Sequence, residues 1–342
     1  MSEKISTTKE MKNIILRGIR VTLLESGSAT KVELSEKLGI SFPTISKFIS
    51  QMEKSGELKS LGLDESSGGR RAWRYAYNPD YQLGVTMFLE KAETQYTIFN
   101  VLGQVKESGT SSGFLHDGID TLTKEVESLM ARHPSIRSLS FGVPGAVKDG
   151  RIIYIPGYEK YQNFDLKRYF EGRFGLPVVV ENDMNAAVLG YCDKMNTPES
   201  HSLIYLYFGQ NGPGAGILVN GSVVRGGTSF SGEVSFAPLY DRRNFHQAIS
   251  DAERTVKVMN DAGGVDAVSR LIATFTAILN PNVVIFCRDE VNEELLEAIA
   301  SRSADYIPKE HLPTLTASDW RDDYLNGLRA LGLNLMITEN ND

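Results

Sequence analysis

Hydrophobic residues near the start of the chain recur at every third or fourth position. Between residues 11 and 25, isoleucine and leucine follow this spacing, which predicts an amphipathic helix. A second, shorter helix is predicted over residues 31–38. Thr30 and Glu33 have the spacing of a capping box, in which each side chain satisfies a backbone N–H of the other residue. This helix is predicted to end at Gly39.

A third helix is predicted to begin with Ser41 as its N-cap and Pro43 in its first turn, where a missing N–H costs nothing. Its apolar residues face inward and leave small polar and lysine side chains on the other faces. Two short helices joined at a glycine match a helix-turn-helix, whose second helix enters the major groove of DNA. The candidate DNA-contacting residues on it are Ser41, Thr44, Ser46, Lys47 and Gln51.

Two strands are predicted next, at residues 57–63 and 72–77. The turn between them contains two glycines followed by Arg70 and Arg71, whose charges suit DNA phosphates or a narrow minor groove. The helices, the glycine turn and this hairpin together predict a winged helix-turn-helix DNA-binding domain over residues 1–78. The alternative is a three-helix interaction module that does not bind DNA.

Beyond a turn at residues 78–80, which is the predicted domain boundary, hydrophobic runs indicate further strands and helices. The strands are predicted at residues 84–89, 94–100, 136–142 and 203–208, the first two as a β-hairpin, and the helices at 118–133 and 165–174.

Three valines at residues 178–180 run into Glu181, Asn182 and Asp183, and a helix of small residues follows from about Asn185. A buried strand that stops at polar side chains beside a helix start is where α/β folds place ligand chemistry. Asp183 could orient or deprotonate a hydroxyl group there, and Asn182 can both donate and accept hydrogen bonds. On these residues alone, helix capping is the simpler interpretation.

A glycine-rich loop at residues 209–216 lies between two predicted strands, and Asn220 and Gly221 predict a hairpin turn after the second. Glycine spacing alone is weak evidence for phosphate binding, since a run of tight turns has the same composition. Strands flank the loop on both sides, which excludes a Rossmann strand-to-helix fingerprint.

The composition is ordinary for a soluble globular protein: 342 residues, 41% hydrophobic and 23% charged, enough for two or three domains. Cys192 and Cys287 are the only cysteines, which excludes a disulfide framework and a cysteine-rich zinc site. No apolar run approaches the length of a membrane span, and the charged start is unlike a signal peptide. We therefore expect a cytoplasmic protein without a membrane partner.

The net charge of −7 is unevenly spread. Residues 1–80 hold 13 Lys and Arg against 10 Asp and Glu, so the rest of the chain carries −10. A mildly basic N-terminal region on an acidic body fits an anionic partner for that region only.

Five stretches of the body, in this order, resemble the motifs of the ROK family (repressors, open reading frames and sugar kinases), within the actin-like, ribonuclease H-like ATPase superfamily. They are GVPGAV at 142–147, VVVENDMNAAVLG at 178–190, FGQNGPGAGILVNGSVVRGG at 208–227, SGEVSF at 231–236 and AILNPNVVIF at 277–286. The resemblance, with the N-terminal region included, spans almost the whole chain. It implies an α/β two-lobed sugar-binding domain over residues 79–342, with lobe one at about 79–195 plus the C-terminal helix and lobe two at about 196–325.

The resemblance also implies roles for single residues. Asn182 and Asp183 match the family's Asn-Asp pair, which holds sugar hydroxyl groups and supplies the catalytic base in the kinases. Glu233 matches a glutamate that contacts the sugar, and Gly145 falls in the loop that closes under the ligand.

The chain departs from the family's kinases at the nucleotide-binding elements. Where the kinases have an Asp-x-Gly-x-Thr phosphate loop, residues 86–92 contain no glycine and no matching Asp, and Met87 and Phe88 are bulky. In the second phosphate loop, Pro213 has no N–H to donate. Residues 287–289 replace the family's later glycines. ATP is therefore not expected as a cofactor.

The zinc ligands of many ROK proteins are missing as well. Phe236 stands at the position of the family's His, and residues 237–265 contain no Cys. His246 is a lone histidine, expected on a surface or loop. We expect no metal site and no cofactor. Phe236 could stack on the apolar face of a sugar, or it could mark a changed or abandoned ligand site.

The leading hypothesis is a transcriptional regulator, most simply a repressor of carbohydrate-metabolism genes. It would bind operator DNA as a homodimer or homotetramer and respond to a sugar or sugar phosphate. One alternative is a sugar kinase with Asp183 as its base. Another is a regulator whose sugar pocket is defunct.

Overall fold

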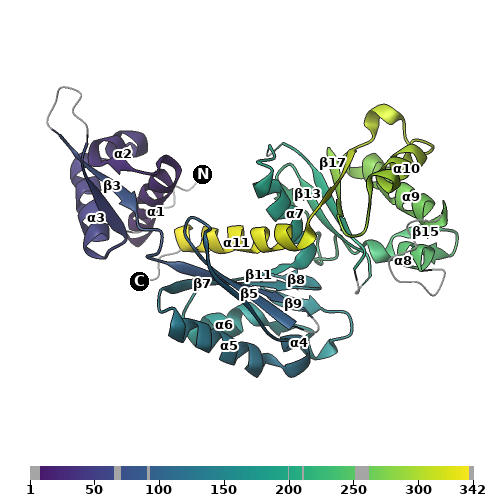
Figure 1. Cartoon of the computed structure of the whole chain (residues 1–342), viewed down its shortest axis with the longest axis horizontal. Coiled ribbons are helices and arrows are strands. Elements are labelled where there is room, and N and C mark those ends of the chain that lie inside the picture. The colour runs from purple at the N-terminus through teal and green to yellow at the C-terminus, as the bar shows by residue number, and fades with distance from the viewer. Residues whose placement is uncertain are drawn as a thin grey trace.

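The computed structural model describes residues 8–64, 71–90, 93–198, 200–209, 212–250 and 262–338. Figure 1 shows a small N-terminal unit, here called the head, and two larger α/β units, here called lobe one and lobe two. A long C-terminal helix runs between these three parts.

The head combines three helices with an antiparallel three-stranded sheet in the order β1-β3-β2. Its elements are α1 (Thr8–Ser26), β1 (Ala29–Thr30), α2 (Lys31–Leu38), α3 (Phe42–Lys54), β2 (Leu58–Leu63) and β3 (Trp73–Tyr77). The three predicted helices and two predicted strands are confirmed. The predicted capping box is present, because the Glu33 amide donates to Thr30 Oγ1 (3.2 Å) and the Thr30 amide donates to Glu33 Oε2 (2.7 Å).

The hydrophobic core of the head continues into the rest of the molecule. Leu34, Ile45 and Ile49 are fully buried in it. The same cluster of contacting side chains includes Phe99 of lobe one and Met336 of the C-terminal helix. The head is therefore packed against the body by apolar contacts.

Lobe one is built on a five-stranded sheet in the order β11-β7-β4-β5-β6. Its elements are β4 (Leu83–Leu89), β5 (Glu93–Asn100), β6 (Val105–Ser112), α4 (Phe114–Asp117), α5 (Ile119–Arg132), β7 (Ile136–Val143), α6 (Leu166–Phe174) and β11 (Val178–Asn182), with a small sheet of β8 (Ala146–Lys148), β9 (Arg151–Tyr154) and β10 (Phe164–Asp165). Strands β4, β7 and β11 are parallel, so their carboxyl ends meet at one edge of the sheet.

Lobe two contains the second five-stranded sheet, in the order β14-β13-β12-β17-β18. Its elements are β12 (Leu203–Tyr207), β13 (Gly214–Val219), β14 (Ser222–Val223), β15 (Pro238–Tyr240), β16 (Arg243–Asn244), α8 (Phe245–Ile249), α9 (Ala262–Leu279), β17 (Val283–Cys287), α10 (Glu293–Ser303) and β18 (Thr314–Ser318). The parallel strands β12, β17 and β18 end on the side that faces lobe one.

Two helices, α7 (Asp183–Lys194) and α11 (Trp320–Thr338), lie between the two sheets (Figure 1). They approach so closely that only glycine fits at the crossing. A Cβ atom on Gly190 would lie 1.8 Å from the carbonyl oxygen of Asp323, and one on Gly327 would lie 1.9 Å from that of Ala186. Helix α7 directly follows β11 of lobe one, and α11 follows β18 of lobe two. Their crossing therefore joins the two lobes.

Helix α9 corrects one expectation from the sequence. Among the residues that the structure describes, it alone is long and apolar enough to cross a membrane by length and composition. Half of this helix is buried inside the protein, and Ala267, Val268 and Ile272 belong to the core of lobe two. This is the environment of a core helix.

Candidate functional site

A cavity of about 300 Å³ lies between the two lobes. The ends of β4, β7 and β11 form one wall, the ends of β12 and β13 form the other, and the start of α11 closes it. This volume is at the lower end of the range of small-molecule sites. Of the five residues predicted to contact a sugar, the structure places Gly145, Asn182, Asp183 and Glu233 in the cavity wall.

Asn182 is both the N-cap of α7 and part of the cavity wall. Its Oδ1 accepts from the amide of Asn185 (2.9 Å), as a helix cap does. Its Nδ2 donates to the carbonyl oxygen of Gly145 (3.0 Å) and to Asp183 Oδ1 (2.8 Å). The capping and the ligand-contacting interpretations of this residue are therefore compatible.

Asp183 lines the cavity beside Asn182. Its Oδ1 accepts from the Met184 amide (2.9 Å) as well as from Asn182, which fixes the orientation of the carboxyl group. Burial, with smaller contributions from the nearby charges of Glu233 and Glu90, raises the pKa of Asp183 to about 7. The carboxyl group can therefore exchange a proton near neutral pH.

Gly145 of lobe one and Glu233 of lobe two are the other two predicted sugar-contacting residues in the cavity wall. A Cβ atom on Gly145 would lie 2.2 Å from the carbonyl oxygen of Tyr154, so no side chain fits there. Glu233 follows the glycine turn after β14 and faces the cavity from lobe two. Burial raises the pKa of its carboxyl group.

Phe236 does not join them, and the prediction of a stacking contact with the sugar is not supported by its position. It is the last residue of a short 3-10 turn (Val234–Phe236), in which Val234 is the side chain that packs inward. Phe236 is 59% exposed, lies outside the cavity wall and contacts the ring of Phe230 at 5.3 Å between centroids.

An ion pair between the lobes was not predicted. The buried carboxylate of Glu181, at the end of β11, pairs with the guanidinium of Arg225 after β14. Glu181 Oε1 also accepts from the Asn182 amide (2.9 Å) and from Asn185 Nδ2 (3.0 Å). The sequence signal available was the glutamate next to the Asn-Asp pair, but its partner lies 44 residues away.

Four aromatic residues from distant parts of the chain line the cavity together. Tyr207 stacks on Trp320 with 4.2 Å between ring centroids, and Phe88 contacts Tyr324 edge-on at 4.3 Å. The indole N–H of Trp320 and the hydroxyl of Tyr324 are buried and make no hydrogen bond. Both polar atoms have almost no accessible surface, so they are enclosed by protein atoms and are not open to the cavity.

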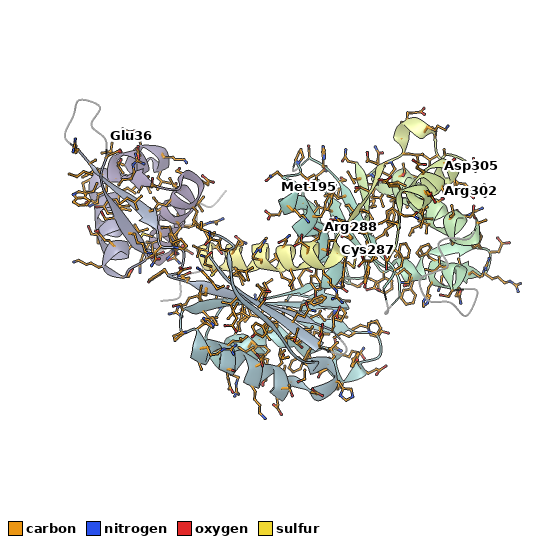
Figure 2. The ribbon with its side chains drawn as sticks, viewed as in Figure 1. Glu36, Met195, Cys287, Arg288, Arg302 and Asp305 are labelled. Carbon is orange, nitrogen blue, oxygen red and sulfur yellow. The ribbon has the colours of Figure 1, made fainter. Side chains whose placement is uncertain are left out.

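The glycine-rich loop after β12 also borders the cavity, through Gly209, Gly212 and Pro213; Gln210 and Asn211 lie outside the described residues. Cys287, labelled in Figure 2, is the last residue of β17 (Val283–Cys287), and the chain continues through Arg288 to Glu290. The carboxyl oxygens of Glu290 accept from the Phe208 amide (3.1 and 3.0 Å), at the start of the glycine-rich loop. Burial raises the pKa of Glu290 to about 7.

Four of the predicted DNA-contacting residues, Thr44, Ser46, Lys47 and Gln51, lie on α3. Lys47 and Gln51 are exposed, whereas Thr44 and Ser46 are partly buried. Ser41 is at the N-cap position, but its hydroxyl bonds the Thr44 hydroxyl (2.9 Å) instead of a helix amide, which corrects its predicted capping bond. In the hairpin, Arg71 is exposed and Arg70 lies outside the described residues.

Residues 99–248 match the family model described as ROK family. The xylose repressor of Caldicellulosiruptor bescii is 27% identical over 228 residues, which cover 64% of this chain and 57% of that protein. The chain thus spans a little over half the length of the curated relatives it matches.

Two solved structures share the fold. A ROK family transcriptional regulator, a homologue of the Escherichia coli MLC protein, aligns with a TM-score of 0.69 at 16% identity over 94% of this chain and 99% of its own. A ROK family glucokinase from Streptomyces griseus, solved with glucose and AMPPNP, aligns with a TM-score of 0.54 at 17% identity over 74% of this chain and 99% of its own. The two solved structures thus share the two-lobed α/β architecture, and the match over residues 99–248 shows that the chain contains a ROK family domain.

Proposed function

We propose that this protein is a DNA-binding transcriptional repressor of carbohydrate-metabolism genes, controlled by a sugar bound between its lobes. The observation that carries this proposal is the presence, in one chain, of a helix-turn-helix-like head and a polar cavity whose acids match the sugar contacts of the ROK family. Relatives named xylose repressors support this combination. Such a regulator would act on DNA in the cytoplasm.

The head supports DNA binding by its arrangement. Helices α2 and α3 are joined at Gly39, and the β2–β3 hairpin follows them, as in a winged helix-turn-helix. Lys47 and Gln51 are exposed on α3, where they could reach base edges. We assign residues 1–78 to this domain and 79–342 to the ROK domain, and we expect a homodimer or homotetramer, since such heads read paired half-sites.

The cavity supports binding of a polyhydroxyl ligand. The carboxyl groups of Asp183 and Glu233 line the cavity and can accept from sugar hydroxyls, and the Asn182 amide group lies beside Asp183 in the same wall.

Sugar phosphorylation is disfavoured by the residues at both phosphate-binding positions. At the first, the Phe88 side chain is 2% exposed and packs against Tyr324. The position therefore lacks the glycine-rich backbone whose amides could approach a phosphate closely. At the second, the Phe208 amide is already bonded to the Glu290 carboxyl group, and a phosphate would meet a like charge. The residues present therefore do not fit ATP, and Phe236 does not fit the family's zinc-ligand position.

A sugar kinase is the second candidate, favoured by one observation. The pKa of Asp183, raised to about 7, suits a general base that deprotonates a sugar hydroxyl. Release of ADP from ATP in the presence of Mg²⁺ and a hexose or pentose would support this candidate, and its absence across a panel of sugars would exclude it.

The repressor proposal is tested by DNA binding with and without sugar. A preferred duplex is first selected from a random library, and its affinity is measured by fluorescence anisotropy. D-Xylose, D-glucose or a related aldose should weaken binding by roughly 5- to 150-fold, the range of typical allosteric coupling. Lys47→Ala should change the sequence preference, whereas Arg71→Ala should weaken binding to selected and random DNA alike. No preferred duplex, or equal affinity with every sugar, would contradict the proposal.

A further inference from the structure

A loop of lobe two, residues 225–231 and here called the strap, is held at both ends by strand β13. Before the strap, the Val224 amide donates to the carbonyl oxygen of Ile217 (2.8 Å), and after it the carbonyl oxygen of Gly232 accepts from the Ala215 amide (2.8 Å). A Cβ atom on Gly232 would lie 2.0 Å from the Ala215 carbonyl oxygen, so the backbone rests directly on the strand. The ends of the strap are therefore fixed to lobe two.

The strap also contacts lobe one at two points. The guanidinium of Arg225 pairs with the carboxylate of Glu181 at the end of β11, and Lys148 Nζ of β8 donates to the carbonyl oxygen of Gly227 (3.4 Å). The strap lines the cavity as well, through Arg225, Ser229 and Ser231. A loop fixed to one lobe thus binds the other lobe beside the ligand space.

The ion pair is the stronger of these two contacts. The Glu181 side chain is 5% exposed, and its Oε1 accepts from the Asn182 amide (2.9 Å) and from Asn185 Nδ2 (3.0 Å). Both donors are neutral, so Arg225 supplies the positive charge that a buried carboxylate requires. The bond from Lys148 is long and lies at the exposed surface, where such a contact contributes little.

The two partners of the ion pair differ in how freely they can move. Glu181 lies directly before α7, and α7 packs on β13 so closely that a Cβ atom on Gly216 would lie 2.0 Å from the carbonyl oxygen of Met184. The Arg225 side chain is 44% exposed and extends from the strap, so its guanidinium can return to water. Separation of the pair therefore moves the strap away from a carboxylate that stays in place.

Building on the proposed function, we propose that the Glu181–Arg225 ion pair is a clasp that holds the strap closed beside the bound sugar, and that its opening sets the rate at which sugar enters and leaves. Arg225 is then a positioning residue, which acts on sugar exchange through the strap. The clasp determines how long the protein stays in its sugar-bound state after the free sugar is removed.

The first test needs no sugar. Hydrogen exchange of the full chain, read by mass spectrometry, compares the parent protein with Arg225→Gln, Glu181→Gln and Arg225→Lys. Both glutamine variants should raise the exchange rate of peptides that cover the strap by about fivefold or more, whereas Arg225→Lys keeps the charge and should lie nearer the parent. The matched control is Arg173→Gln, which breaks an exposed pair with Glu127 (2.6 Å) within lobe one and should leave the strap unchanged.

The second test measures sugar release. A sugar that binds is chosen by calorimetry from D-xylose, D-glucose and related aldoses. Its dissociation is followed by stopped-flow fluorescence of Trp320, which lines the cavity, in a Trp73→Phe background, or by rapid filtration of the labelled sugar where the fluorescence does not change. Dissociation should be about fivefold or more faster in Arg225→Gln. High salt should accelerate it in the parent more than in this variant, because salt screens a partly exposed pair.

Unchanged hydrogen exchange of the strap in Arg225→Gln would overturn the clasp, whatever the sugar does. Faster exchange of the strap with unchanged sugar release would overturn the role in sugar exchange and leave the proposed sugar control intact. If no sugar binds, the proposed sugar control fails and the role in sugar exchange fails with it, while the first test still decides whether the ion pair closes the strap.

Discussion

Asp183 contributes both to the first turn of a helix and to the wall of the proposed ligand site. Its Oδ1 accepts from the Met184 amide in the first turn of α7, while the carboxyl group lines the cavity. Burial raises its pKa to about 7, whereas an aspartate in an unfolded chain titrates near ~3.9. Between these values the folded chain holds a proton that the unfolded chain has lost, so stability falls as pH rises through this window.

Asp183→Asn should therefore stabilise the protein at pH 8 and have little effect near pH 4.5. A rise in pKa from about 3.9 to about 7 corresponds to roughly 4 kcal/mol, and solvent screening at a partly exposed group reduces it, so we expect a gain of about 2 kcal/mol. Urea denaturation of both proteins at the two pH values measures this difference. The variant should also bind sugar at least about tenfold more weakly. Equal or lower stability of the variant at pH 8 would contradict the assigned environment.

At the scale of elements, the crossing of α7 and α11 determines how the lobes meet. Gly327 packs so closely that a methyl group would overlap the carbonyl oxygen of Ala186. Because this contact is backbone to backbone, no side chain can rotate away to relieve the overlap. The helices would have to move apart.

Gly327→Ala should lower the free energy of unfolding by roughly 2–4 kcal/mol, through overpacking at a rigid contact. The measurement is the urea midpoint of the full chain. Gly172→Ala is the control, because Gly172 is exposed on α6 and a Cβ there meets nothing within 4 Å. That substitution should raise stability by up to about 1 kcal/mol. A loss of similar size at both positions would point to a general effect of glycine replacement.

Elements with a clear local pattern could be predicted from the sequence, and others could not. The capping box at Thr30 and the valine strand before Asp183 carry their signals within a few residues. Strand β6, VKESGTSS, was missed because it has no alternation of apolar residues; its pairing with β5 decides its structure. Its side chains alternate between partly buried and exposed without an apolar face.

The candidate site was predictable where a motif is contiguous and was missed where contacts are long-range. Asn182 and Asp183 are adjacent, so both were found. Tyr207 and Trp320 are more than a hundred residues apart, and only the fold shows that they stack. Phe236 was assigned to the sugar from its motif position, but the direction of a side chain in a 3-10 turn depends on local packing that the motif does not encode.

At the scale of the whole molecule, α11 connects the cavity to the head. Figure 1 shows α11 running from lobe two to the head. Trp320 and Tyr324 in its first turns line the cavity, and Met336 in its last turn is buried in the cluster that forms the head's core. A sugar that shifts the start of α11 would also move the other end of the helix, which is packed in the proposed DNA-binding domain. Coupling between two such sites is typically ~1–3 kcal/mol.

Met336→Ala should uncouple the two sites without removing either. Truncating this buried side chain loosens the contact between α11 and the head, so the sugar affinity should stay within about twofold, while the weakening of DNA binding by sugar should fall by at least half. Asn334→Ala, at an exposed position on the same helix, should retain the full effect. Met336→Leu, which conserves volume, separates uncoupling from a loss of folding, since it should restore the response. If Met336→Ala responds to sugar as the parent protein does, the signal passes by another route, such as the spacing of the heads in the dimer.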